Sequence, residues 1–259
     1  MKTLLTNQSL VVASVLALAS LPTQAAFTTF FGEDINNSNT NPLATFPNAS
    51  AAEASFLSQL IGVGTETFEG QLGSSPLALS FPGAGTATLN GGGGQIISLA
   101  SENISNGFGR YGVTRDGGAE NFWEISAGRA GDFTIAFSDP VAAFGFYGID
   151  IGDFGGGLRL NLVGGGAQLV NVPNTQGSSG STDGSVLFFG FVNNNPLETV
   201  TSIDFLTSTG QGDVFAFDDM TIGSIQQVRT PDGGGTLTLL GSAFAALTLV
   251  ARGARRGNA

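Results

Sequence analysis

Short apolar or alternating runs follow one another along most of the chain, and glycine-rich turns separate them. Residues 132–137 (DFTIAF) alternate with period two, as expected of a strand that buries one face. Residues 141–151 (VAAFGFYGIDI) form the strongest strand pattern, and residues 186–192 (VLFFGFV) are continuously apolar, which predicts a central strand. The pattern therefore predicts a domain made mainly of β-strands.

Further short runs complete the expected strands. They lie at residues 65–69, 77–81, 85–89, 95–99, 109–114, 121–126, 158–163, 168–172, 200–206 and 214–222. We expect Gly164-Gly165-Gly166 to turn a hairpin between 158–163 and 168–172, and Gly155-Gly156-Gly157 to form another turn. The predicted fold class is all-β, an antiparallel jelly-roll-like β-sandwich of two sheets, with a closed barrel as the alternative.

One short helix is expected near the start of this domain, at residues 51–61 (AAEASFLSQLI). Ser50 would cap it, and Glu53 three residues later would complete a capping box. The helix belongs to a lead-in segment, residues 27–64, that we expect to pack against the β-sandwich at residues 65–228. Its apolar face would consist of Phe56, Leu57, Leu60 and Ile61.

The first 26 residues have the pattern of a secretory signal peptide. Lys2 gives a positive start, residues 10–21 are apolar, and small residues end the segment before Phe27. We therefore expect the chain to be exported.

The last residues, 229–259, have three parts. A polar joint at 229–235 contains Pro231 and three glycines, an uncharged apolar stretch follows at 236–251, and a basic end closes the chain at 252–259. The apolar stretch is about 16 residues long, slightly shorter than the roughly 20 that a membrane-spanning helix needs. Arginines behind such a helix fit its cytoplasmic side. We expect a C-terminal transmembrane helix.

This tail resembles the PEP-CTERM family of protein-sorting signals, in the variant with a Val-Pro-Asp-Ser/Gly-Gly signature. The resemblance covers about 30 of 259 residues, with Thr230 where that variant has Val. It implies transient membrane anchoring, recognition by a sorting and processing transpeptidase, and transfer to the cell surface or extracellular matrix. An ordinary membrane anchor is the alternative. The matching residues are Pro231, Asp232, Gly233, Arg252, Arg255 and Arg256.

The body of the chain is rich in glycine and phenylalanine, with 40 and 21 residues respectively. It is similar to the glycine- and phenylalanine-rich β-domains that accompany PEP-CTERM tails, in residues 67–70 (TFEG), 143–146 (AFGF) and 217–223 (FDDMTIG). Between residues 27 and 229 only five arginines stand against 19 carboxylates, so the net charge of this span is about −14. Nucleic-acid binding is excluded, because phosphate contacts need a basic surface.

Several classes of catalytic site are excluded by missing residues. The sequence has no histidine and no cysteine, and Lys2 is its only lysine, so catalytic triads, ordinary zinc sites and Schiff-base chemistry have no residues to use. Carboxylates remain, and a glycoside hydrolase or lyase is the alternative function, with Trp123 as a sugar platform. Its candidate carboxylates would be Glu120, Glu124, Asp150 and Asp153.

Two acidic groups are candidates for structural calcium, which prefers carboxylates and carbonyl oxygens in loops. The first is Asp150 with Asp153, and the second is Asp213 with Asp218 and Asp219. In many sugar-binding jelly rolls a calcium ion ties an early-strand Glu to a last-strand Asp, and by that resemblance Glu69 would meet Asp218 or Asp219. Both aspartates could join one site only if the strand bends there. Otherwise they simply end a strand and cap backbone amides.

Trp123 and Tyr111, near Arg110 and Arg115, would form a saccharide-binding surface if they are exposed. The alternative is that Trp123 belongs to the core. The leading hypothesis is an exported, non-catalytic protein of the cell surface or extracellular matrix that binds exopolysaccharide and calcium.

Overall fold

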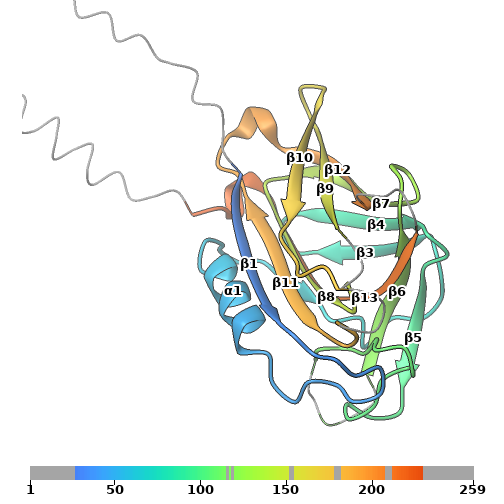
Figure 1. The fold of residues 1–259 in the computed structure, drawn as a ribbon. Coiled ribbons are helices and arrows are strands. Elements are labelled where there is room, and N and C mark those ends of the chain that lie inside the picture. Colours follow the sequence, from blue (N-terminus) through green and yellow to red (C-terminus); the bar gives the residue numbers. More distant parts are fainter. Residues whose placement is uncertain are drawn as a thin grey trace, which may run out of the picture.

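The structure is a computed structural model that describes residues 27–114, 117, 120–151, 155–177, 182–207 and 212–229. Within these residues the chain forms a sandwich of two antiparallel sheets (Figure 1). The all-β sandwich expected from the sequence is therefore confirmed. No helix among the described residues is long and apolar enough to cross a membrane, and the expected span at 236–251 lies outside them.

The first sheet has the strand order β1-β11-β8-β13-β6-β5, and β2 also pairs with β13. Its strands are β1 (Thr28–Asp34), β2 (Thr65–Glu66), β5 (Gln95–Leu99), β6 (Glu120–Ala127), β8 (Ala143–Ile149), β11 (Val186–Val192) and β13 (Asp213–Gly223). Because β1 pairs with β11, the lead-in segment is part of the sheet and does not merely pack against it.

The second sheet has the order β10-β9-β12-β7-β4-β3. Its strands are β3 (Leu77–Phe81), β4 (Gly85–Gly91), β7 (Phe133–Val141), β9 (Gly156–Leu162), β10 (Ala167–Val172) and β12 (Val200–Thr207). The hairpin predicted over Gly164-Gly165-Gly166 is confirmed, since β9 and β10 pair antiparallel on either side of it. The other glycine triplet does not form a turn, because Gly156 and Gly157 begin β9.

Phenylalanine side chains fill the space between the two sheets. Phe217 on β13 stacks on Phe146 of β8, with ring centroids 4.9 Å apart and planes 13° apart. The same ring lies within 6.5 Å of Phe144 and within 5.9 Å of Phe205 across the sandwich. This contiguous aromatic cluster forms the core between the two sheets.

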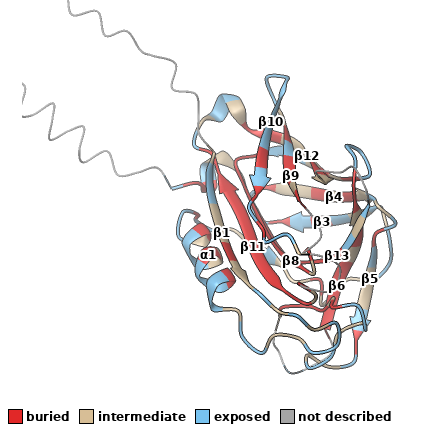
Figure 2. Cartoon of the chain, viewed as in Figure 1, coloured by how far each residue is buried: buried red, intermediate tan, exposed pale blue. Residues whose placement is uncertain are grey.

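A second apolar layer covers the outer face of the first sheet. The helix α1 (Pro47–Leu57) lies beside β1 and β11, and the middle strands β8 and β11 are buried along their whole length (Figures 1 and 2). Glycines in these strands leave room for the side chain of Phe56, which projects from the helix. A Cβ atom at Gly145 would lie 2.9 Å from the ring of Phe56, and one at Gly190 would lie 3.0 Å from it. The described residues also include two short 3-10 helices, η1 (Pro196–Glu198) and η2 (Ile225–Gln227).

The prediction for the helix was wrong in both bounds and in its cap, because the helix spans Pro47–Leu57 and ends four residues before Ile61. The helix begins at Pro47, and the carboxylate of Asp34 on β1 accepts hydrogen bonds from the amides of Asn48 (3.3 Å) and Ala49 (2.9 Å). The cap therefore comes from another element and not from Ser50. Glu53 accepts a hydrogen bond from the Tyr147 hydroxyl instead of closing a capping box. Of the expected apolar face, Ile61 is exposed.

Candidate functional site

The last strand of the first sheet contains a β-bulge at the two aspartates singled out in the sequence. Asp218 lies opposite Tyr147 of β8, and Thr221 lies opposite Gly145, so β13 has one extra residue between them. Asp219 has a φ of 42°, in the left-handed region. The bend required for both aspartates to approach one point is therefore present.

Asp218 is fully buried, and both of its oxygens accept hydrogen bonds. Its Oδ2 accepts one from the Val113 amide (2.7 Å), and its Oδ1 accepts one from the Asp219 amide (2.9 Å). Asp219 accepts a hydrogen bond from the Thr114 hydroxyl at 2.8 Å. Residues 109–114 were predicted to be a strand, but they form a loop over the outer face of the sheet. In this loop the hydrogen-bond donors of Tyr111, Val113 and Thr114 bind acceptors of other segments and not a neighbouring strand.

The carboxylates of this cluster repel one another. Burial raises the pKa of Asp218 well above its usual value, and the charges of Asp219 and Glu69 raise it further. Burial raises the pKa of Asp219 to about 7, with further contributions from Glu53, Glu69 and Glu66. The charge of Glu69 thus acts on both aspartates. Among the described residues, however, no group of three or more acidic side chains already surrounds a metal position.

Arg110 connects the other acidic candidates. Its Nε lies 2.9 Å from Glu124 Oε2, and its Nη1 lies 3.3 Å from Asp150 Oδ2. Burial raises the pKa of Asp150 to about 7, although the Gly184 amide and Arg110 favour its ionised form. Asp150 is thus paired with an arginine, and Asp153 lies outside the described residues. Glu120, the remaining described carboxylate of the hydrolase alternative, is fully buried.

The two aromatic residues expected to bind saccharide are both in the interior. Trp123 lies between the sheets and Tyr111 beneath the outer layer, and each side chain is 0% exposed. The Tyr111 hydroxyl donates to the Gly184 carbonyl at 2.7 Å and accepts from the Leu43 amide at 3.0 Å. Neither ring can stack on a sugar in solution, so the expected surface was wrong and the core alternative for Trp123 is correct. The aromatic residue exposed near Arg110 is Phe108.

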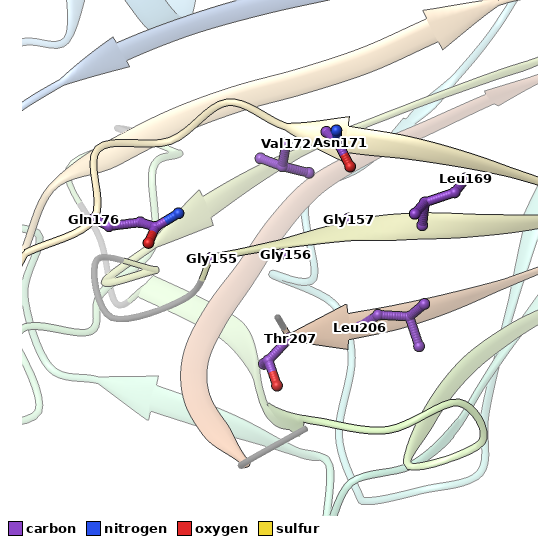
Figure 3. Close-up of a pocket in the computed structure, with 9 residues that line it drawn as sticks. All are labelled: Gly155, Gly156, Gly157, Leu169, Asn171, Val172, Gln176, Leu206 and Thr207. Atoms are coloured by element: carbon purple, nitrogen blue, oxygen red, sulfur yellow. The ribbon is translucent and has the colours of Figure 1, made fainter. Parts of the chain in front are cut away.

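A recess that the sequence reading missed lies on the outer face of the second sheet. Gly157 on β9 lies opposite Asn171 on β10 and opposite Leu206 on β12. These positions face away from the core, since their neighbours in sequence face into it. Those neighbours are Leu158, Val170, Val172 and Phe205. Because Gly157 has no side chain, the flanking side chains stand on either side of bare backbone (Figure 3).

We call this recess the Gly157 trough. It has a volume of about 400 Å³, which lies within the range of small-molecule sites. Its described lining is uncharged and consists of Gly155, Gly156, Gly157, Leu169, Asn171, Val172, Gln176, Leu206 and Thr207.

The chemistry of the trough combines amides with apolar carbon. Leu169 is 57% exposed, and it stands one outward-facing position along β10 from Asn171 (Figure 3). Within the described part of the chain, the side-chain amides of Asn171 and Gln176 have no hydrogen-bond partner. Each amide offers donors and an acceptor to a ligand. The trough therefore suits an uncharged ligand that carries both hydroxyl groups and apolar faces.

The residues of the sorting signal are not part of this geometry. Pro231, Asp232, Gly233 and the three C-terminal arginines lie outside the described residues, as does Arg115.

Comparisons with known proteins give only distant likenesses. No protein-family model matches the sequence, and no curated protein matches it. The K2 cleaved adhesin domain of Lys-gingipain is 16% identical with a TM-score of 0.33, over 62% of this chain and 97% of that domain. The family 11 carbohydrate-binding module of the cellulosomal cellulase Lic26A-Cel5E of Clostridium thermocellum is 14% identical with a TM-score of 0.28, over 63% and 96%. Neither likeness assigns a function to this chain.

Proposed function

We propose that this chain is an exported, non-catalytic protein of the cell surface or extracellular matrix, and that its jelly-roll-like sandwich binds a neutral exopolysaccharide. The observation that carries the proposal is the Gly157 trough, with its uncharged lining of amides and aliphatic side chains. A neutral hexose has hydroxyl groups around its ring edge and C–H groups on its faces. Asn171 and Gln176 would bind the hydroxyl groups, while Leu169 and Leu206 would contact the faces.

The absence of ionisable groups from the described lining supports binding without catalysis. Glycoside hydrolysis needs two carboxylates beside the scissile bond. The alternative is a carboxylate-dependent hydrolase or lyase, and among its candidate carboxylates Asp153 lies outside the described residues while Glu120 is fully buried. The other two are Glu124 on β6 and Asp150 just after β8. Their side chains are only 18% and 13% exposed and are both paired with Arg110.

Variants of the trough should lose affinity for neutral polysaccharides. Asn171→Ala removes one hydrogen bond, worth about 0.5–1.5 kcal/mol, so affinity should fall roughly 2- to 12-fold. The double variant Leu169→Ala, Asn171→Ala should lose more, because the aliphatic contact is lost as well. Binding to hydroxyethylcellulose and galactomannan is measured by affinity electrophoresis and calorimetry.

The controls separate the trough from its surroundings. Gln168→Ala changes an exposed β10 residue outside the described lining and should bind normally. Arg159 lies opposite Leu169 in the strand register, and the variant Arg159→Gln should also bind normally. If Arg159→Gln lost binding, the ligand would be acidic, because only an acidic ligand needs the arginine charge. The proposal is wrong if no neutral polysaccharide binds, if the double variant binds as the wild type does, or if reducing ends are released.

We also propose that calcium binds at the acidic cluster around the bulge. The donor chemistry of Glu69, Asp218 and Asp219 fits calcium, which takes carboxylate oxygens. Their mutual repulsion supports the proposal, since a cation there would neutralise like charges that now oppose one another. Because these side chains do not yet surround one point, binding requires them to move together.

A proposal for export and sorting rests on the sequence patterns of residues 1–26 and 229–259. We propose that the signal peptide is removed, and that the C-terminal helix anchors the chain in the membrane until a transpeptidase processes it near Pro231. Mass spectrometry of the mature protein should then show a chain that begins near Phe27 and ends near Pro231. A mature chain that still contains Arg256 would favour the permanent membrane anchor.

A further inference from the structure

Phe108 is the one largely exposed aromatic side chain among the residues that the structure describes, at 66%. Isolated exposed apolar residues are common and by themselves indicate nothing. What distinguishes Phe108 is the number of contacts that fix its position.

A tight loop presents the Phe108 ring. The amide of Asn106 donates to the Arg110 carbonyl at 2.9 Å, and the amide of Phe108 donates to Asn106 Oδ1 at 3.0 Å. Gly107 and Gly109 flank Phe108 with φ values of 88° and 86°, which side chains other than glycine rarely adopt. The backbone of the loop is thus specialised to hold one aromatic residue at its tip.

Arg110 supports one face of the ring. The guanidinium carbon lies 5.3 Å from the ring centroid of Phe108, and Glu124 and Asp150 fix the guanidinium in turn. In a third hydrogen bond, the guanidinium of Arg110 donates to the Val214 carbonyl at 3.1 Å. An aromatic ring held in this way loses little conformational entropy when a ligand stacks on its open face.

Phe108 and the Gly157 trough lie toward the same end of the sandwich. Asp150 contacts Arg110 just after the end of β8, and Gly155 lines the trough just before β9 begins. Asp150 and Gly155 are five positions apart in the sequence, so their Cα atoms are at most about 18 Å apart. Phe108 lies on the loop over the outer face of the first sheet, and the trough opens on the outer face of the second sheet. A polymer strand that contacts both must therefore pass around this end of the sandwich.

We propose that Phe108 is a stacking platform for a pyranose ring, and that one polysaccharide strand contacts both Phe108 and the Gly157 trough. This inference rests on the proposed function and assigns a second contact to it. The apolar C–H face of a neutral sugar fits the open face of the ring. An anionic lipid surface or nucleic acid fits poorly, because the body of the chain has a net charge of about −14.

The test compares polymers with short saccharides. Phe108→Ala should weaken binding of hydroxyethylcellulose or galactomannan roughly 2- to 12-fold, the effect expected of an aromatic contact worth about 0.5–1.5 kcal/mol. Binding of cellobiose or mannobiose, which reach only the trough, should not change. The double variant of the trough should weaken both the polymer and the disaccharide. Phe108→Trp should restore polymer binding.

Further measurements distinguish a loss of the Phe108 contact from a folding defect and from binding to a different partner. The melting temperature of Phe108→Ala should equal that of the wild type, and Leu72→Ala, at a site 84% exposed, should bind polymer normally. If Phe108→Ala binds polymer as the wild type does, this inference fails while the trough proposal stands. If the wild type binds no saccharide, both fail. Sedimentation with phosphatidylglycerol vesicles that is lost in Phe108→Ala would also overturn the inference.

Discussion

Acidification from pH 7.5 to pH 5, with a chelator present, should raise the melting temperature of this protein by on the order of 5 °C. Burial raises the pKa of Asp150 and of Asp219 from 3.8 to about 7, and that of Asp218 also lies well above 3.8. Burial raises the pKa of Glu53 as well. Most proteins lose stability on acidification through carboxylates whose pKa is depressed in the folded state, so the expected direction here is unusual.

The direction of this change in stability follows from the number of protons that each state binds. Between about pH 4 and pH 7 the folded state holds protons on these carboxyl groups that the unfolded state has already released. The contribution to stability is therefore complete below the unfolded pKa values and is lost as the pH rises through about 7. Thermal unfolding followed by circular dichroism at a series of pH values measures the effect. A melting temperature that falls steadily from pH 7.5 to pH 5 would contradict it.

Calcium should replace the protons at neutral pH. At pH 7.5 it should raise the melting temperature, and at pH 5 it should do so much less, because protonated carboxyl groups bind calcium weakly. Asp218→Asn removes one buried charge while preserving the shape of the side chain. This variant should be less sensitive to both pH and calcium. If calcium gives no shift at pH 7.5 and chelator gives none, the calcium proposal is wrong.

Replacing Phe217 by alanine should lower the free energy of unfolding by about 3–5 kcal/mol, the range measured for deletion of a buried aromatic ring. The ring is fully buried, stacks on Phe146, and lies 6.0 Å from Phe133 and 6.1 Å from Phe68. Its removal leaves a cavity between the two sheets that the rigid strands cannot close. Urea unfolding should show a lower midpoint with an unchanged slope.

Leu72→Ala is the matched control for this experiment, because its side chain is 84% exposed. Its free energy of unfolding should change by less than about 0.5 kcal/mol. Phe217→Leu should fall between the two, since it retains part of the buried volume. Equal stability of Phe217→Ala and the wild type would show that the inter-sheet cluster is not the core of the fold.

Strand positions could be predicted from the sequence because each depends on local alternation and on glycine-rich boundaries. The runs at 77–81, 95–99 and 186–192 match β3, β5 and β11 in both bounds. Their apolar positions are decisive, since a shift by one residue would place the wrong side chains in the core. The pairing of β1 with β11, in contrast, joins segments far apart in sequence, and no local pattern indicates it.

The parts of the candidate site that could not be predicted depend on tertiary contacts. Asp34 caps a helix that begins thirteen residues later, so the local capping pattern at Ser50 was misleading. Trp123 is buried by the opposite sheet, which its own segment does not reveal. Gly157 was interpreted as part of a turn, and only its neighbours on β10 and β12 make it the floor of a trough.

The loop of residues 110–114 touches both acidic regions of the first sheet. Arg110 binds Glu124 and Asp150, while Val113 and Thr114 bind Asp218 and Asp219. This short segment therefore connects the bulge to the base of the Phe108 loop. By thermodynamic linkage, a saccharide on Phe108 and an ion at the bulge would change each other's affinity by the same factor.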